Sequence, residues 1–150
     1  MGLVSSALWL AGGHRLPRGM SKALLESPAL VLYSLAPHVG GSIGETQDFH
    51  GYPVLGSISL QGSEKTRIVL NLHAALLSHP LLMAVFCFRP RHGLRALWDG
   101  HCYDLLICFE CLNTRGFRDN ESFEGVIGPF GAGHLNSVLA AHGIPLPPPP

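Results

Sequence analysis

Charged side chains are scarce in this sequence, and it contains no long hydrophobic run. Asp, Glu, Lys and Arg make up 13% of the chain, about half the usual share, and the net charge is zero. A chain without net positive charge lacks the electrostatic footprint of a DNA- or RNA-binding protein, so no nucleic-acid partner is predicted. The longest apolar run, Leu81 to Phe88, is much shorter than the about 20 residues that cross a bilayer, so no transmembrane segment is predicted.

Signals for export and for cofactors are missing as well. The first residues contain a short apolar stretch without a preceding positive charge, which makes a poor signal peptide. We therefore expect a cytoplasmic protein, with export as the open alternative, and four reduced cysteine thiols. No glycine-rich phosphate loop occurs, and Leu112 stands where haem attachment to a C-x-x-C sequence would need a His. No cofactor is predicted.

Apolar residues are plentiful and suit one folded domain. They make up 47% of the 150 residues, enough to offset the conformational entropy lost on ordering. Glycine and proline are frequent near both ends of the chain. We therefore expect a flexible leader over residues 1–20, a single domain over residues 21–146 and a proline tail over residues 147–150.

Hydrophobic periodicity predicts an α+β fold. Helices are expected at Ser21 to Ser27, Glu64 to Ser78 and Leu135 to His142, with Ser63 capping the second and Gly143 ending the third. Strands are expected at Leu30 to Leu35, Tyr52 to Leu60, Leu82 to Phe88, Gly93 to Trp98 and His101 to Cys111, with a short sixth near Phe123 to Ile127. The second strand alternates apolar and polar residues and holds Gly56, a candidate bulge. The prediction is a mainly antiparallel sheet of five to six strands, with two main helices packed on one face.

The dipeptide Asp99-Gly100 lies between two apolar runs and is a strong signal for a two-residue β-hairpin. Such a turn pairs Trp98 with His101 and, further along, Arg95 with Asp104. The opposite charges of Arg95 and Asp104 support this register independently, because the turn alone determines it.

A candidate ligand or anion site follows from strand parity before this hairpin. Pairing Phe88 with Leu94 places Cys87 beside Arg95 on the outer face of the sheet. The side chains that share this face or the adjoining turn are Cys87, Arg89, Arg91, His92, Arg95, Cys108 and Glu110.

The same parity separates the two cysteines of the C-x-x-C sequence. Extending the hairpin register brings Arg91 near Cys108 and Arg89 near Glu110. No glycine stands between Cys108 and Cys111, and residues three apart in a regular strand point to opposite faces. We therefore expect Cys111 on the core side.

These residue types suit several kinds of chemistry. Cys87, His92 and Cys108 could hold a metal, but structural zinc needs four ligands and no second C-x-x-C occurs, so no metal is predicted. A redox pair is disfavoured because the C-x-x-C of such proteins begins a helix. A cysteine thiolate beside arginine could act as a nucleophile, and the basic turn could bind an anion. Buried thiols and ordinary cross-strand ion pairs remain the favoured alternative. A second group of polar and aromatic residues is His50-Gly51-Tyr52, where His50 is expected to cap a strand.

Three sequence stretches resemble a family of small uncharacterised bacterial proteins. They are FHGYPVLG at Phe49 to Gly56, CFRPRHGLR at Cys87 to Arg95 and DLLICFEC at Asp104 to Cys111. The likeness extends over roughly residues 24 to 146, including the helix between the first two stretches and GIPL at Gly143 to Leu146. The resemblance implies a bacterial source and a shared fold, without a function. Some such proteins begin with an export or lipoprotein signal, but this chain has no cysteine near its start for lipid attachment.

No catalytic constellation is complete in the sequence. We therefore expect a non-catalytic ligand-binding or interaction domain, whose partner is an unknown small ligand or protein. The alternative is a Cys/His/Arg site that binds a metal or a small anionic ligand and holds a reactive thiol.

Overall fold

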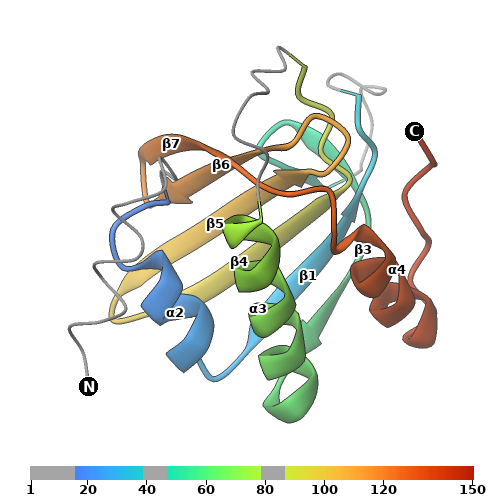
Figure 1. Cartoon of the computed structure of the whole chain (residues 1–150). Coiled ribbons are helices and arrows are strands. Elements are labelled where there is room, and N and C mark those ends of the chain that lie inside the picture. Colours follow the sequence, from blue (N-terminus) through green and yellow to red (C-terminus); the bar gives the residue numbers. More distant parts are fainter. Residues whose placement is uncertain (1–15, 39–46, 79–86) are drawn as a thin grey trace.

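The structure is a computed structural model that describes residues 16–38, 47–78 and 87–150 (Figure 1). Its strands form one antiparallel sheet of seven strands, in the order β2-β3-β1-β4-β5-β6-β7. They are β1 (Leu30–Leu35), β2 (Asp48–Phe49), β3 (Tyr52–Leu60), β4 (His92–Trp98), β5 (His101–Cys108), β6 (Asn113–Arg118) and β7 (Glu121–Val126). The helices are α2 (Met20–Glu26), α3 (Gly62–Leu77) and α4 (Ala132–Ala141). The predicted α+β class and antiparallel sheet are confirmed, with seven strands where five to six were expected.

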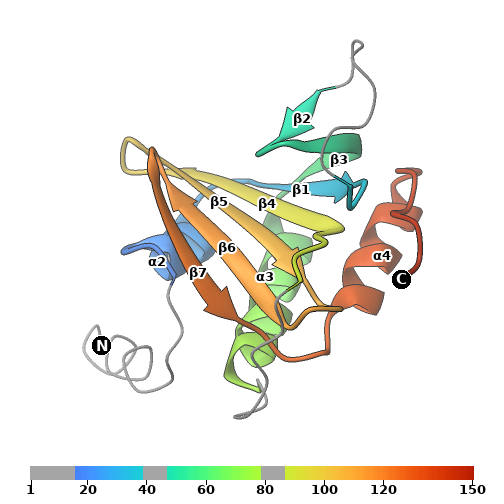
Figure 2. The ribbon, with the colours of Figure 1, turned by 90° about the horizontal axis from the view of Figure 1, so that it is seen from above.

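The three described helices pack on one face of the curled sheet, and the main core lies between these helices and the sheet (Figures 1 and 2). Apolar side chains recur at helical spacing in each helix, so that each presents one stripe to the sheet. These are Met20, Ala23 and Leu24 in α2, Ile68, Leu72, Ala75 and Leu76 in α3, and Leu135, Val138 and Leu139 in α4. Each fully buried leucine or isoleucine stabilises the fold by roughly 1.5–3 kcal/mol relative to an exposed one.

The opposite face, here called the outer face, is partly covered by the hairpin that joins β2 to β3. At its tip the backbone turns through positive φ values of 51° at His50 and 89° at Gly51. The turn lays Phe49 over Tyr33 of β1, with 4.3 Å between the ring centroids. Together with Tyr52 and other apolar side chains, these rings form a second buried cluster. The outer face is therefore packed in part.

A β-bulge in β3 explains how one strand serves both clusters. Ser34 pairs with Gly56 but Leu35 pairs with Val54, so Leu55 is an extra residue. A bulge reverses the side-chain alternation of its strand. Ile58 and Leu60 consequently pack on the helix side, whereas Val54 packs with the outer cluster. The sequence places the bulge at Gly56, and the extra residue is its neighbour Leu55; the regular alternation expected for this strand therefore breaks between Val54 and Ile58.

The neighbour of β4 is a strand from far back in the sequence. Leu94 pairs with Leu32 of β1 and with Leu105 of β5. The predicted pairing of Phe88 with Leu94 is therefore wrong. Residues 82–86 of the expected third strand lie outside the described residues, and Cys87 and Phe88 are not in a strand. Turn residues indicate only which neighbouring segments pair, so the sequence carries no such signal for the pairing of β1 with β4.

Smaller differences concern β6 and the ends of helices and of the chain. The sequence predicts no strand over residues 113–118, which form β6 beside β5. The N-cap of α3 is Gln61 without a side-chain cap, so Ser63 does not cap it. Gly143 follows α4 with a φ of 69°, as expected for a helix end. Residues 1–15 of the predicted leader lie outside the described residues, whereas Met20 is only 1% exposed in the core.

The close approach of β4 to Phe49 gives a test of the outer cluster. A Cβ added at Gly93 would lie 2.7 Å from the Phe49 ring and 3.4 Å from Leu35. We expect Gly93→Ala to lower the free energy of unfolding by roughly 1–3 kcal/mol in urea titrations, because the packed ring must move. Gly133→Ala in α4 is the control. Nothing lies within 4 Å of its added Cβ, and the change should leave stability equal or higher. Equal effects of the two substitutions would contradict this packing.

Candidate functional site

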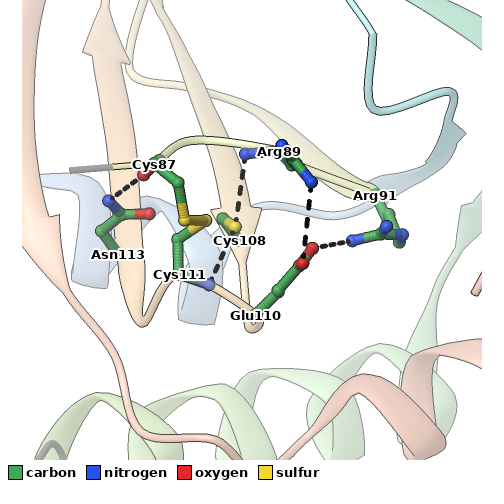
Figure 3. Close-up of a disulfide and its surroundings, with 7 residues drawn as sticks. All are labelled: Cys87, Arg89, Arg91, Cys108, Glu110, Cys111 and Asn113. Carbon is green, nitrogen blue, oxygen red and sulfur yellow. Dashed lines mark hydrogen bonds and ion pairs between the residues drawn. A yellow bond between two sulfur atoms is a disulfide. The ribbon is translucent and has the colours of Figure 1, made fainter. Parts of the chain in front are cut away.

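The turn between β5 and β6 overturns the predicted separation of the two C-x-x-C cysteines. β5 ends at Cys108, and residues 109–112 form a turn whose last residue, Leu112, has a φ of 58°. The turn carries Cys111 back to Cys87, to which it is disulfide-bonded with a Cα–Cα distance of 5.6 Å (Figure 3). The expectation of four reduced thiols is thus wrong for this pair. Strand parity failed because the strand ends three residues earlier than expected.

Cys108 is a buried free thiol beside this disulfide (Figure 3). Its sulfur accepts hydrogen bonds from the backbone N–H of Arg89, at 3.4 Å, and from that of Cys111, at 3.2 Å. Burial raises the pKa of the Cys108 thiol, and the two N–H donors lower it by less. The thiol is therefore neutral at rest, in a position where a thiolate would be hydrogen-bonded twice.

Two arginines and one glutamate surround the same turn. Arg91 Nη1 donates to Glu110 Oε2 at 2.7 Å, and Arg89 Nη1 lies 4.0 Å from Glu110 Oε1 (Figure 3). The hydrogen bond from Arg91 lowers the pKa of Glu110. Arg91 also donates through Nε to the carbonyl oxygen of Pro148 at 2.7 Å, and through Nη2 to that of Pro149 at 3.5 Å. Arg89 lies near Glu110 as predicted, whereas Arg91, which was expected near Cys108, is bonded to Glu110 and to the C-terminal tail.

His92 faces the helices and not the cysteines and arginines of this turn, although its ring lies 5.9 Å from that of Phe109. It is 2% exposed, and its Nε2 donates to Asn136 Oδ1 of α4 at 2.8 Å. Its Nδ1 is buried without a hydrogen-bond partner. Burial lowers the pKa of His92 to about 4, so the ring is neutral at pH 7. His92 is a core residue that ties β4 to α4.

The structure thus gathers five of the seven predicted site residues and places two elsewhere. Cys87, Arg89, Arg91, Cys108 and Glu110 surround the β5–β6 turn, whereas His92 faces α4 and Arg95 belongs to a separate cluster. The expected position of Cys87 beside Arg95 is wrong because Cys87 is bonded to Cys111. Within the described residues, no three His, Cys, Asp or Glu side chains could hold a metal ion together.

The separate cluster is centred on the buried carboxylate of Asp104, on the outer face. Arg95 donates to it twice, from Nε to Oδ1 at 2.7 Å and from Nη2 to Oδ2 at 2.8 Å. This confirms the register predicted from Asp99-Gly100. His50 donates from Nε2 to Oδ2 at 2.7 Å and stacks on Phe117, with 3.8 Å between ring centroids. His50 was expected to cap a strand, but it binds the Asp104 carboxylate. The sequence signal closest to this role is the turn glycine, Gly51, that follows it.

The charge balance around Asp104 keeps its carboxylate ionised. Burial raises the pKa of Asp104, but hydrogen bonds from Arg95 and His50 lower it further, so the net shift is downward. Cys102 donates weakly to Oδ1 at 3.6 Å, and burial followed by the nearby Asp104 charge raises the pKa of its thiol. A Cys/His/Asp set is thus present, but its thiol is held neutral. The arrangement favours a structural role over nucleophilic catalysis.

No protein-family model, curated protein or solved structure matches this chain. None of the described helices has both the length and the apolar character needed to cross a membrane.

The Asp104 cluster predicts a large difference between two acidic residues of the outer face. Asp104→Ala leaves Arg95 and His50 without their shared acceptor, and we expect the free energy of unfolding to fall by roughly 2–4 kcal/mol. Glu124→Ala removes only an exposed pair with Arg115 at 3.8 Å and should cost less than about 0.5 kcal/mol. Chemical denaturation at neutral pH measures both. Losses of equal size would refute the anchoring role of Asp104.

The neutral buried ring of His92 predicts a defined pH dependence. The pKa of His92 is near its ordinary value of 6.5 in the unfolded chain and about 4 in the folded protein, so between these pH values the unfolded chain binds more protons. The contribution of His92 to stability should therefore fall as the pH drops from about 6.5 to about 4, by a total of roughly 3 kcal/mol. Urea denaturation at several pH values should show a shallower fall for His92→Gln. Identical slopes for the variant and the parent chain would contradict this assignment.

Proposed function

We propose that this chain is a non-catalytic interaction domain that binds extended, proline-rich segments at the Arg91 side chain. The observation that carries the proposal is the contact between Arg91 and the chain's own tail, where the guanidinium donates to two consecutive proline carbonyls. Arg91 is suited to this role because its side chain is only 14% exposed and is oriented by Glu110. A fixed donor costs less conformational entropy on binding than a mobile one.

The tail follows a defined path to this donor. A Cβ added at Gly56 in β3 would lie 2.7 Å from Ile144 and 3.2 Å from Pro145, so the tail passes closely over that glycine. Pro147 is buried, and Pro148 and Pro149 then reach Arg91. The contact thus extends over several consecutive residues.

The chemistry of proline explains the choice of ligand. A proline has no N–H, so a proline-rich segment offers carbonyl acceptors without donors and needs donors from its partner. Such segments already adopt the extended polyproline II conformation, which lowers the entropy cost of ordering. Arg91 supplies two donors of fixed geometry.

A second candidate function is the binding of a small anion at the same turn. Arg89 favours it, since its side chain is 58% exposed and its distance to Glu110 is 4.0 Å. Two arginines facing one glutamate leave a surplus positive charge for an anionic group. The version with a metal is less favoured, because Cys87 is disulfide-bonded and His92 faces α4.

The disulfide bears on the compartment in which the protein works. The sequence predicts a cytoplasmic protein, but disulfides persist mainly in oxidising compartments. We infer from the Cys87–Cys111 bond that the protein works in such a compartment. The likeness to the small bacterial family stays a prediction.

The proposal is tested by offering the tail sequence to a chain whose own tail docks poorly. In the full chain with Pro148→Gly and Pro149→Gly, the Arg91 Nε–H resonance should move away from its position in the parent chain. Added peptide IPLPPPP should return it toward that position, in the roughly millimolar range expected of a small interface.

The controls separate recognition of proline from non-specific binding. A Gly/Ser peptide of equal length should not shift the Arg91 resonance. The proline peptide should not shift the resonance of Arg67, which lies on α3. Inorganic phosphate tests the second candidate. If phosphate shifts the Arg89 and Arg91 resonances and the proline peptide does not, the anion function replaces the proposed one.

A further inference from the structure

The proposed function leaves the cysteines of the β5–β6 turn without a role. Three of them meet there, a disulfide between Cys87 and Cys111 and a free thiol at Cys108 (Figure 3). Cys108 is the last residue of β5, three positions before Cys111, and its sulfur lies 3.2 Å from the Cys111 backbone nitrogen. A free thiol next to the backbone of a disulfide-bonded cysteine has the components needed for exchange.

We propose that Cys108, Cys111 and Cys87 form an internal thiol–disulfide exchange site. The Cys108 thiolate attacks the sulfur of Cys111, an S–S bond forms between Cys108 and Cys111, and the bond between Cys111 and Cys87 breaks. Cys87 leaves as a thiolate and takes up the proton that Cys108 lost. No electrons are gained or lost overall, so the step needs no external oxidant or reductant.

The backbone around Cys108 supports the attack. The N–H groups of Arg89 and Cys111 already point at its sulfur and would strengthen their hydrogen bonds once it carries a negative charge. The positive side chains of Arg89 and Arg91 lie at the same turn. These donors offset part of the cost of forming a thiolate in a buried position.

The exchange would change what holds the connection before β4. In the structure the disulfide joins Cys87 to a turn 24 residues further on, and Asn113 Nδ2 donates to the Cys87 carbonyl at 2.9 Å. After exchange that hydrogen bond, the contacts of Arg89 and Arg91 and the packing of Phe88 against Tyr52 would remain, without a covalent link. The inference is independent of the proposed function, because it concerns sulfur chemistry and not the recognition of proline.

Differential alkylation of the full chain tests the site. The native, non-reduced protein is treated with N-ethylmaleimide between about pH 7 and about pH 9, quenched in acid and digested with trypsin and a glutamate-specific protease. These enzymes cut after Arg91 and after Glu110 and thereby separate Cys87, Cys108 and Cys111. We expect label at Cys87 that increases with pH, together with a Cys108–Cys111 linkage.

Two variants identify the attacking thiol. Cys108→Ser should lose the Cys87 label, whereas Cys102→Ser should keep it, because Cys102 donates toward Asp104 and not toward the disulfide. Near-UV circular dichroism checks that Cys108→Ser is folded, and direct mapping of linkages in the parent chain gives an answer that does not need the variant. Labelling of Cys102 and Cys108 alone, with Cys87 and Cys111 still linked at every pH, would overturn the proposal. Loss of Cys87 label in Cys102→Ser would overturn it as well.

Discussion

The outer face of the sheet depends on one buried carboxylate. Asp104 has a side chain only 5% exposed, and an ionised group removed from water must find charged or hydrogen-bonding partners. Arg95 supplies two donors from the neighbouring strand, and His50 supplies a third from the β2–β3 hairpin. Because His50 is fixed in this way, the adjacent Phe49 ring is placed over Tyr33. A single electrostatic requirement thus holds a distant hairpin on a face that the helices leave uncovered.

Local sequence signals predicted the elements and one register well. The strands at Leu30–Leu35 and Tyr52–Leu60 have the expected bounds, since β-branched and aromatic residues there are bounded by prolines or by a helix start. The Asp99-Gly100 turn gave the pairing of Arg95 with Asp104, because a two-residue hairpin leaves no freedom in register. The pairing of Asp104 with Arg95 was therefore predictable, whereas its contact with His50 was not. In each case the determining contacts lie close together in sequence.

The features that the sequence did not predict depend on contacts between distant residues or on where a strand stops. β1 pairs with β4, although β2, β3 and α3 lie between them in the sequence, and no local pattern indicates such a partner. His50 reaches Asp104 over 54 residues. The disulfide was missed because the end of β5 was placed three residues too late. β5 was extended to Cys111, but the chain turns after Cys108, and strand parity holds only while the strand continues.

The β5–β6 turn shows why chemistry is harder to predict than fold in this protein. The groups that act on the Cys108 sulfur are backbone N–H groups, which every residue except proline carries and which no motif records. The groups that act on the tail are Nε–H and Nη2–H of Arg91, whose Nη1 donates to Glu110. Both arrangements arise where three segments far apart in sequence meet at one end of the sheet. The antiparallel sheet positions these loops, so the contacts of Cys108 and Arg91 follow from that position and not from the composition of the loops.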